Sequence, residues 1–488
     1  MTILIQGAYV LDLDRPFEKT DILIEDDLIV EVGASLAPRT GATTIDASDM
    51  IVMPGLINAH THSNQAIEKG LADKLPLDAW MILASYGGAG ARLEPRDLYV
   101  SAMVGAIEML STGTTAVLDC MRSDFAWLDT GMDAVMQAYA DIGLRANLAM
   151  QYADLDFFSS IPIGLIDAPS DLRNEQRRST VEEVLAQAEH FVDRWQGKHH
   201  LLTPMLGPSS VARCSDELFR GTVDLVKRKK VSLQSHLLSA KSQVAVGQER
   251  FSGSTVRHLA EIGALESWSS YAHGIWISDD EIPILASTNA AIVHNPVSNQ
   301  KLGAGIAPVP DLDQAGVRIA LGADGSSSGD SQNMFEVIKS TALIHRIANP
   351  PSKWLGASDA LRMCWRGGAS VMGHPIGRIA TGYKADLTIL KTETLFPAPK
   401  HQIVSQLVYA EMGRSVDTVF VGGELVLEHG KLTKIDAPAI IDEAKALATR
   451  IWNGLPERLS RFENIRPVLE ELEAAVGRIP LAFARHCG

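Results

Sequence analysis

Two histidines separated by one residue, His60 and His62, end the apolar stretch "PGLINAHTH" (54–62). Side chains two positions apart in a β-strand point to the same face of the sheet. Two neutral imidazoles on one face at a strand end can bind one metal ion. Ordinary polar histidines at the start of a loop can have the same spacing, because so short a motif often arises by chance. The rest of the chain must distinguish these interpretations.

Three further polar residues lie where an apolar run meets a loop: His236 in "VSLQSHL" (231–237), His273 in "SSYAHG" (269–274) and Asp324 in "VRIALGADG" (317–325). A single histidine in such a position is more often a satisfied core residue than a ligand. Five such residues at one edge of one sheet are hard to explain by chance. Three imidazoles and one carboxylate are typical of a catalytic site for zinc or a similar divalent metal, with one position open to water.

Eight strands must bring these residues together. The first ends at His60, and the others are expected at 114–120, 145–153, 200–210, 231–237, 269–274, 290–295 and 317–325. Helical patterns separate them, among them 95–113, 179–195 and 216–230. Eight such units predict an α/β fold, a (β/α)8 TIM barrel, whose active site lies at the carboxyl ends of its strands.

Both ends of the chain carry short strands and turns. "TDILIEDDLIVEVGA" is a predicted hairpin with Asp26 and Asp27 at its turn, and Gly422-Gly423 marks a tight turn late in the chain. We therefore expect one small β-sandwich built from residues 1–53 and 377–435, around a metal-binding barrel formed by 54–376. Residues 436–488 are expected to form a helical extension laid over the barrel.

Composition excludes several classes of partner. The 488 residues carry a formal net charge of −15, which argues against binding to nucleic acid or to an anionic membrane. No run approaches 18 apolar residues, so no membrane span is expected, and the N-terminus lacks the features of a signal peptide. The four cysteines, Cys120, Cys214, Cys364 and Cys487, are scattered without a CxxC motif, which predicts reduced thiols in a cytoplasmic protein.

The stretch "PGLINAHTHSNQAIEKGLADKLPLDAW" resembles the opening signature of the amidohydrolase superfamily. The similarity is greatest to the branch that contains adenosine-type, guanine-type and 8-oxoguanine deaminases and the s-triazine hydrolases. "STGTTAVLD" (111–119), residues 294–325 and "GRIATGYKADLTIL" (377–390) match the same branch in order and spacing. "LGPSS" (206–210) is closer to the triazine hydrolases. The resemblance spans roughly residues 1–435, and it implies a (β/α)8 barrel with a β-sandwich.

Residue by residue, the resemblance implies that His60, His62, His236 and Asp324 bind the metal, with His273 hydrogen-bonded to the attacking hydroxide or to the substrate. Related binuclear enzymes bridge two metals through a carbamylated lysine on the fourth strand, which "HLLTPMLGPSS" lacks. One divalent ion is therefore expected, zinc before iron. The expected substrate contacts are Gln65, Trp80, Ser209, Gln234 and Ser239.

The fifth strand departs from the pattern of the related deaminases, which read "HxHxxE" there. In "LQSHLLSAKSQ", Gln234 replaces the first histidine, and Ser239 replaces the glutamate that shuttles protons to the ring under attack. Serine is not acidic enough to protonate a ring nitrogen at neutral pH. Two interpretations remain: an enzyme in which Asp324 is both base and acid, or a binding protein that has lost activity. The complete metal set favours the enzyme.

The sequence thus predicts a cytoplasmic, homo-oligomeric, mononuclear metal-dependent hydrolase of a non-peptide C–N bond. Its expected substrate is a small nitrogen-rich, heterocyclic compound. Asp119 is expected to be structural. Lys241, Ser327 and Ser328 are further candidate contacts, for which a solvated loop is the simpler interpretation.

Overall fold

A computed structural model describes residues 1–86, 93–122, 128–169, 179–392 and 402–485. Eight parallel strands form one sheet in which each strand pairs with its neighbours in chain order. They are β6 (Leu56–Thr61), β7 (Thr114–Met121), β8 (Arg145–Tyr152), β9 (Leu202–Pro208), β10 (Leu233–Leu237), β11 (Ser269–His273), β12 (Ala291–His294) and β13 (Arg318–Leu321). All eight expected strands are therefore present.

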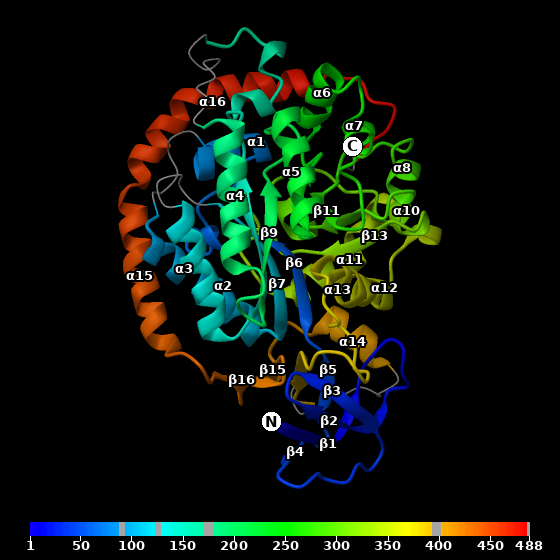
Figure 1. The fold of residues 1–488 in the computed structure, drawn as a ribbon. Coiled ribbons are helices and arrows are strands. Elements are labelled where there is room, and N and C mark those ends of the chain that lie inside the picture. Colours follow the sequence, from blue (N-terminus) through cyan, green and yellow to red (C-terminus); the bar gives the residue numbers. More distant parts are fainter. Residues whose placement is uncertain (87–92, 123–127, 170–178, 393–401, 486–488) are drawn as a thin grey trace.

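The sheet curls until its last strand returns to its first. The backbone N–H of Asp324, just after β13, donates to the carbonyl oxygen of His60 on β6 over 2.9 Å. Helices connect the strands and surround them (Figure 1), which confirms the (β/α)8 barrel. They are α1 (Leu77–Met81), α2 (Pro95–Ser111), α3 (Leu128–Ile142), α4 (Val181–Trp195), α5 (Asp216–Lys229), α6 (Lys241–Arg250), α7 (Thr255–Glu261), α8 (Ile282–Ala286), α9 (Pro296–Lys301), α10 (Val309–Gln314), α11 (Met334–Ala348), α12 (Ala357–Arg362) and α13 (Gly368–Met372).

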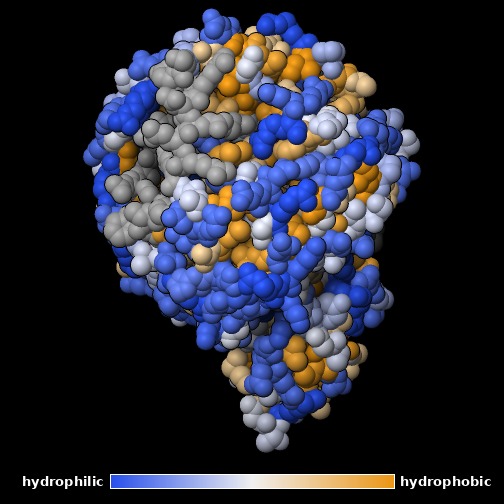
Figure 2. Space-filling view, turned by 45° about the horizontal axis from the view of Figure 1, so that its top comes forward, coloured by the Kyte–Doolittle hydropathy of each residue, from blue (hydrophilic) through white to orange (hydrophobic). Residues whose placement is uncertain are grey.

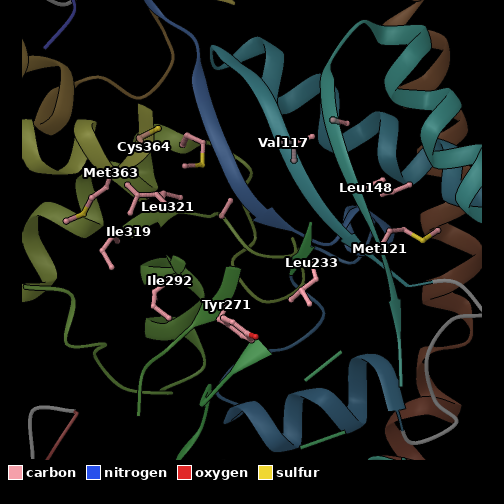
Figure 3. Close-up of a cluster of buried hydrophobic side chains, with 14 of the residues drawn as sticks. Val117, Met121, Leu148, Leu233, Tyr271, Ile292, Ile319, Leu321, Met363 and Cys364 are labelled. Atoms are coloured by element: carbon pink, nitrogen blue, oxygen red, sulfur yellow. The ribbon is translucent and has the colours of Figure 1, made fainter. Parts of the chain in front are cut away.

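Successive side chains along each barrel strand point alternately into the barrel interior and outward to the surrounding helices. On β7, Ala116 and Leu118 belong to a cluster of mostly small residues inside the barrel, whereas Val117 and Met121 pack with the helices. Figure 3 shows side chains of this outer layer from six of the barrel strands. At the carboxyl ends of the strands, the side chains that point into the barrel are polar.

A second, nine-stranded sheet contains both ends of the chain, as the sequence predicts. Its strands are β1 (Thr2–Val10), β2 (Glu18–Glu25), β3 (Leu28–Gly33), β4 (Thr43–Asp46), β5 (Ile51–Pro54), β14 (Leu387–Leu390), β15 (Val416–Val421), β16 (Glu424–Glu428) and β17 (Lys431–Leu432). The small β domain lies at the end of the barrel away from its carboxyl-end mouth (Figure 1). Arg145 of the barrel forms a fully buried two-bond ion pair with Asp386, at 2.7 and 2.9 Å, which fixes the two parts together.

Three helices follow or accompany the second half of the small domain: α14 (Ile403–Ala410), α15 (Ala437–Asn453) and α16 (Leu455–Gly477). Helix α15 runs along the outside of the barrel beside α2, and α16 crosses its carboxyl end (Figure 1). Arg458 of α16 and Glu68, both buried, pair at 3.2 Å. Helix α16 of the C-terminal extension therefore covers the carboxyl end of the barrel, where the candidate site lies.

The face of the molecule seen in Figure 2 is mostly hydrophilic with scattered hydrophobic patches. Within the described ranges, no helix has the length and apolar character needed to cross a membrane. Cys120, Cys214 and Cys364 are free and buried, and Cys487 lies outside the described residues.

Candidate metal and active site

Four imidazoles and one carboxylate meet at the carboxyl ends of the barrel strands. His60 lies on β6 and His62 directly follows that strand, His236 lies on β10, His273 ends β11, and Asp324 follows β13. The Nε2 atoms of His62 and His236 are 3.2 Å apart. Asp324 Oδ1 lies 3.5 Å from Nε2 of His62 and 3.7 Å from Nε2 of His60. Such separations are those of neighbouring ligands around one ion with metal–ligand distances of about 2.0–2.2 Å.

Each imidazole is oriented by an oxygen at its other nitrogen. The Nδ1 contacts are His60 with Gln234 Oε1 at 2.7 Å, His62 with the Cys120 carbonyl at 2.6 Å, His236 with the Ser209 carbonyl at 2.5 Å, and His273 with Asn299 Oδ1 at 3.0 Å. An oxygen acceptor at Nδ1 places the proton there and leaves the lone pair on Nε2. All four Nε2 lone pairs are thereby available at the centre of the barrel mouth.

Electrostatics favours the protonation states that a cation requires. Burial lowers the pKa of His60 to about 3, and the neighbouring His62 adds to the shift. Burial opposes ionisation of Asp324, but the imidazoles of His273, His60 and His62 together hold its pKa below the ordinary range. Neutral imidazoles beside an ionised carboxylate are the form in which these groups bind metal.

Two of these residues have a strained backbone. His273 has φ of +75° and Asp324 has φ of +64°, both in the left-handed region that non-glycine residues rarely adopt. Such conformations persist only where the surrounding structure enforces them, and they concentrate at functional sites. Here the strain turns each side chain from its strand toward the shared centre.

The donor set fits one divalent ion. Nε2 of His60 is buried and has no hydrogen-bond partner among the described residues, an arrangement that is costly unless a cation occupies the site. His60, His62 and Asp324 offer atoms within 4.8 Å of one another, and so do His60, His236 and His273. Strand β9, "LTPMLGP", carries no lysine that could bridge a second ion.

A cavity of about 750 Å³, its open mouth included, adjoins this centre. Four of the five expected substrate contacts line it: Gln65, Trp80, Ser209 and Ser239. The Ser327 hydroxyl donates to Gln65 Oε1 at 2.8 Å, and the Trp80 indole donates to the Ser327 carbonyl at 3.2 Å. Ser327 thus supports the cavity wall from behind.

Gln234 lies elsewhere than the sequence predicts. It is fully buried and is not among the residues that line the cavity. Its oxygen accepts from Nδ1 of His60, and its nitrogen donates to the Ala59 carbonyl at 3.0 Å and the Ser270 hydroxyl at 3.1 Å. Because its side-chain atoms are occupied inside the barrel, Gln234 orients His60 and does not face a substrate.

Ser327 and Ser328 are buried and do not form the solvated loop that the sequence predicts, whereas Asp119 and Lys241 have the contacts of structural and surface residues. Asp119 accepts from the Ser63 backbone N–H at 3.0 Å and the Tyr139 hydroxyl at 2.9 Å, which is a structural role. The Lys241 ammonium donates to the Gly477 carbonyl at 3.0 Å on the surface.

Sequence reasoning missed several residues that line the cavity: Asp78, Arg122, Gln151, Arg213 and Gln243. Gln151 lies on β8, and the other four come from helices and connections between strands; no recurrent motif marks any of them. One signal was present for Asp78, since it lies within the long connection after the first barrel strand, two residues before Trp80.

Comparison with known proteins gives a consistent result. The amidohydrolase family profile matches residues 51–426. The chain is 30% identical over 459 residues to a 5-methylthioadenosine/S-adenosylhomocysteine deaminase of Carboxydothermus hydrogenoformans, covering 93% of this chain and 99% of the relative. It is 32% identical over 454 residues to a 5'-deoxyadenosine deaminase of Methanosarcina mazei, covering 92% and 98%. An atrazine chlorohydrolase from Arthrobacter aurescens TC1, solved with zinc, superimposes with a TM-score of 0.81 at 26% identity over 91% of this chain and all of that one.

Proposed function

Because this chain belongs to the amidohydrolase family, we propose that it is a metal-dependent hydrolase of a carbon–nitrogen bond, outside peptides, in a small nitrogen-rich heterocycle. The observation that carries the proposal is the convergence of four oriented imidazoles on one carboxylate, with Nε2 of His60 left unpartnered. Relatives named as adenosine-derivative deaminases and an atrazine hydrolase support a heterocyclic substrate.

His60, His62, His236 and Asp324 would hold one divalent ion, for which we propose zinc, the metal in the atrazine chlorohydrolase. A bound ion of this kind lowers the pKa of its water toward neutrality. Asp324 accepts the proton of the attacking water, and the water oxygen adds to an electrophilic sp2 carbon of the ring. Asp324 then gives this proton to the leaving nitrogen.

His273 orients the attacking water. Its Nε2 lies 3.9 Å from Asp324 Oδ2, so a water between the two would contact both. Asn299 holds the opposite nitrogen of the ring at 3.0 Å and so fixes the direction of the imidazole. Gln65, Trp80, Ser209 and Ser239 then contact the substrate beside this water.

A catalytically degenerate binding protein is the second candidate, because Ser239 stands where related deaminases carry a glutamate. The ionised, strained Asp324, on which the four imidazoles converge, favours the enzyme, since a binding protein needs no such acid–base group. We also propose a cytoplasmic location, where the free cysteines stay reduced, and a homo-oligomeric assembly, which light scattering would measure.

The test is a hydrolysis screen with the zinc-loaded full-length protein. The panel contains 5'-deoxyadenosine, 5-methylthioadenosine, S-adenosylhomocysteine, amino-triazines, cyclic ureas and cyclic amides. Ammonia and amine products are measured separately, which sorts deamination from amide-type cleavage. Turnover of an amino-heterocycle supports the proposal, and binding without turnover across the panel would favour the degenerate binder.

A further inference from the structure

The cavity contains a carboxyl group that the mechanism above does not use. Of the residues that line it in the described part of the chain, two are acidic: Asp324 at the metal centre and Asp78 on α1. Asp78 is partly buried, and it lies beside α16, which packs against both α1 and α6. It belongs to the cavity wall and not to the strand-end ring.

Asp78 lines the same cavity as Ser239, the position at which related deaminases carry a glutamate. Its polar neighbour is Ser242, in the first turn of α6, which begins two residues after Ser239. Ser239 also lines the cavity, and its buried hydroxyl has no partner among the described residues. Ser239, two residues before α6, therefore lines the cavity together with Asp78, and Ser242 in the first turn of α6 is the polar neighbour of Asp78.

The surroundings of Asp78 shift its carboxyl group toward the protonated form. Burial raises its pKa to about 6, the interaction with Ser242 opposes the shift, and the negative charge of Glu473 on α16 adds to it. The other charged groups nearby are Lys241 at the start of α6, whose ammonium is held by the Gly477 carbonyl, and Arg122 and Arg213 on the cavity lining. A carboxyl group with a pKa near neutrality can both give and take a proton.

We propose that Asp78 replaces the missing fifth-strand glutamate as the catalytic acid for the ring nitrogen of an amino-substituted heterocycle, an inference that rests on the proposed function. This assignment narrows the reaction to deamination or amine release from a ring in which the attacked carbon is doubly bonded to a nitrogen. A carboxyl group on α1 and one on the fifth strand are interchangeable in this role, provided that both reach the same ring nitrogen.

The proton transfers balance as follows. The oxygen of water bonds to the ring carbon, Asp324 takes the proton lost by that water, and the O–H of Asp78 protonates the ring nitrogen as the C=N bond becomes single. The exocyclic C–N bond then breaks, and the leaving nitrogen takes the proton from Asp324. The carbon hydroxyl loses its proton to solvent as the carbonyl forms, and Asp78 regains a proton from solvent.

The first experiment compares matched variants on the amino-heterocycle that the screen identifies. Asp78→Asn keeps the shape but removes the acid, so kcat should fall by about 10²-fold or more with KM changed little. Asp78→Glu should stay within about tenfold of wild type because it keeps a carboxyl group. Asp73→Asn, at an exposed aspartate on the same connection, is the control and should change nothing.

The second experiment relocates the carboxyl group. Adding Ser239→Glu to the Asp78→Asn protein should raise kcat at least about tenfold above that of Asp78→Asn alone. Zinc content and the thermal unfolding temperature of every variant should equal those of wild type. An Asp78→Asn protein that loses zinc or unfolds at a lower temperature would overturn the proposal, because Asp78 would then be structural.

The third experiment does not depend on turnover. Calorimetry with adenine and melamine, two amino-substituted rings with nitrogen acceptors, should show binding at pH 5.5 about tenfold weaker for Asp78→Asn than for wild type, the effect of one lost hydrogen bond. Failure of the proposed function would appear as absence of wild-type turnover with this difference intact. Equal binding, or wild-type turnover with Asp78→Asn within about threefold, would overturn the role of Asp78 alone.

Discussion

Two groups of buried histidines in this protein have opposite surroundings. In the metal centre, each imidazole has an oxygen at Nδ1, and its Nε2 faces a carboxylate or another imidazole. His294, at the end of the neighbouring strand β12, packs instead on His345 of α11 with 5.3 Å between ring centroids. None of the four nitrogens of this pair has a hydrogen-bond partner among the described residues.

The comparison shows that burial at a strand end is not sufficient for a metal site. Burial is the main cause of the lowered pKa of His60, His236 and His273 and also of that of His294, and it lowers the pKa of His345 to about 4. What distinguishes the metal centre is the set of oxygen acceptors that fix each tautomer, together with one carboxylate on which the rings converge. We refer to the two groups as the metal centre and the His294–His345 pair, and four predictions test their difference.

The largest effect should come from removing a ligand. In His236→Ala we expect the zinc content to fall from about one per chain to a small fraction of that, with turnover at background, because the ion loses one of four donors. Elemental analysis after reconstitution with zinc measures the zinc content per chain. His345→Ala is the matched control, and it should keep its zinc. Two ions per wild-type chain, or full zinc content in His236→Ala, would contradict the assignment of a single ion held by this set.

Asp324→Asn separates the role of Asp324 in zinc binding from its role in proton transfer. Asparagine still offers an oxygen to the metal but cannot accept a proton, so zinc should be retained while kcat falls by roughly 10²- to 10⁴-fold. Zinc content and steady-state kinetics on the same preparation decide the question. Activity within a few-fold of wild type would remove Asp324 from proton transfer.

Gln234→Leu tests whether orientation of a ligand matters as much as its presence. It removes the acceptor at Nδ1 of His60 and should weaken zinc affinity by about 10- to 100-fold, the usual cost of losing such a group. Competition with a chelator measures the affinity, and the thermal unfolding temperature of the zinc-free variant checks the fold. Gln196→Leu, at an exposed glutamine outside the site, is the control. Unchanged zinc affinity in Gln234→Leu would show that the barrel alone orients His60.

The smallest effect concerns the His294–His345 pair and appears only in acid. The pKa of His345 is about 4 in the folded chain, against about 6.5 when unfolded, so the unfolded state binds the proton first. Its contribution to stability is complete above pH 6.5 and is lost as the pH falls toward 4, by up to about 3 kcal/mol. Urea unfolding at pH 7.5, 6 and 5 should show that the free energy of unfolding falls less steeply with decreasing pH for His345→Leu than for wild type. The exposed His190→Leu should follow wild type, and identical slopes for all three proteins would contradict the prediction.

Periodicity and spacing predicted most of the architecture. All eight barrel strands, the β2–β3 hairpin and the small domain built from both chain ends could be predicted, because strand alternation and turn residues are local signals. The convergence of the five residues of the proposed metal centre could be predicted for a related reason: in a barrel, the carboxyl end of a strand is a position in space as well as in sequence.

The sequence by itself could not separate His236 from His294, since each ends an apolar run, nor place Gln234 beneath the site and Asp78 beside it. Those distinctions depend on which oxygen faces each nitrogen and on how α1, α6 and α16 pack across the barrel mouth. The sequence therefore determined the strands, the two-histidine motif and the missing glutamate at Ser239. Only the tertiary structure decided which groups surround the cavity, because contacts between residues hundreds of positions apart leave no local pattern in the chain.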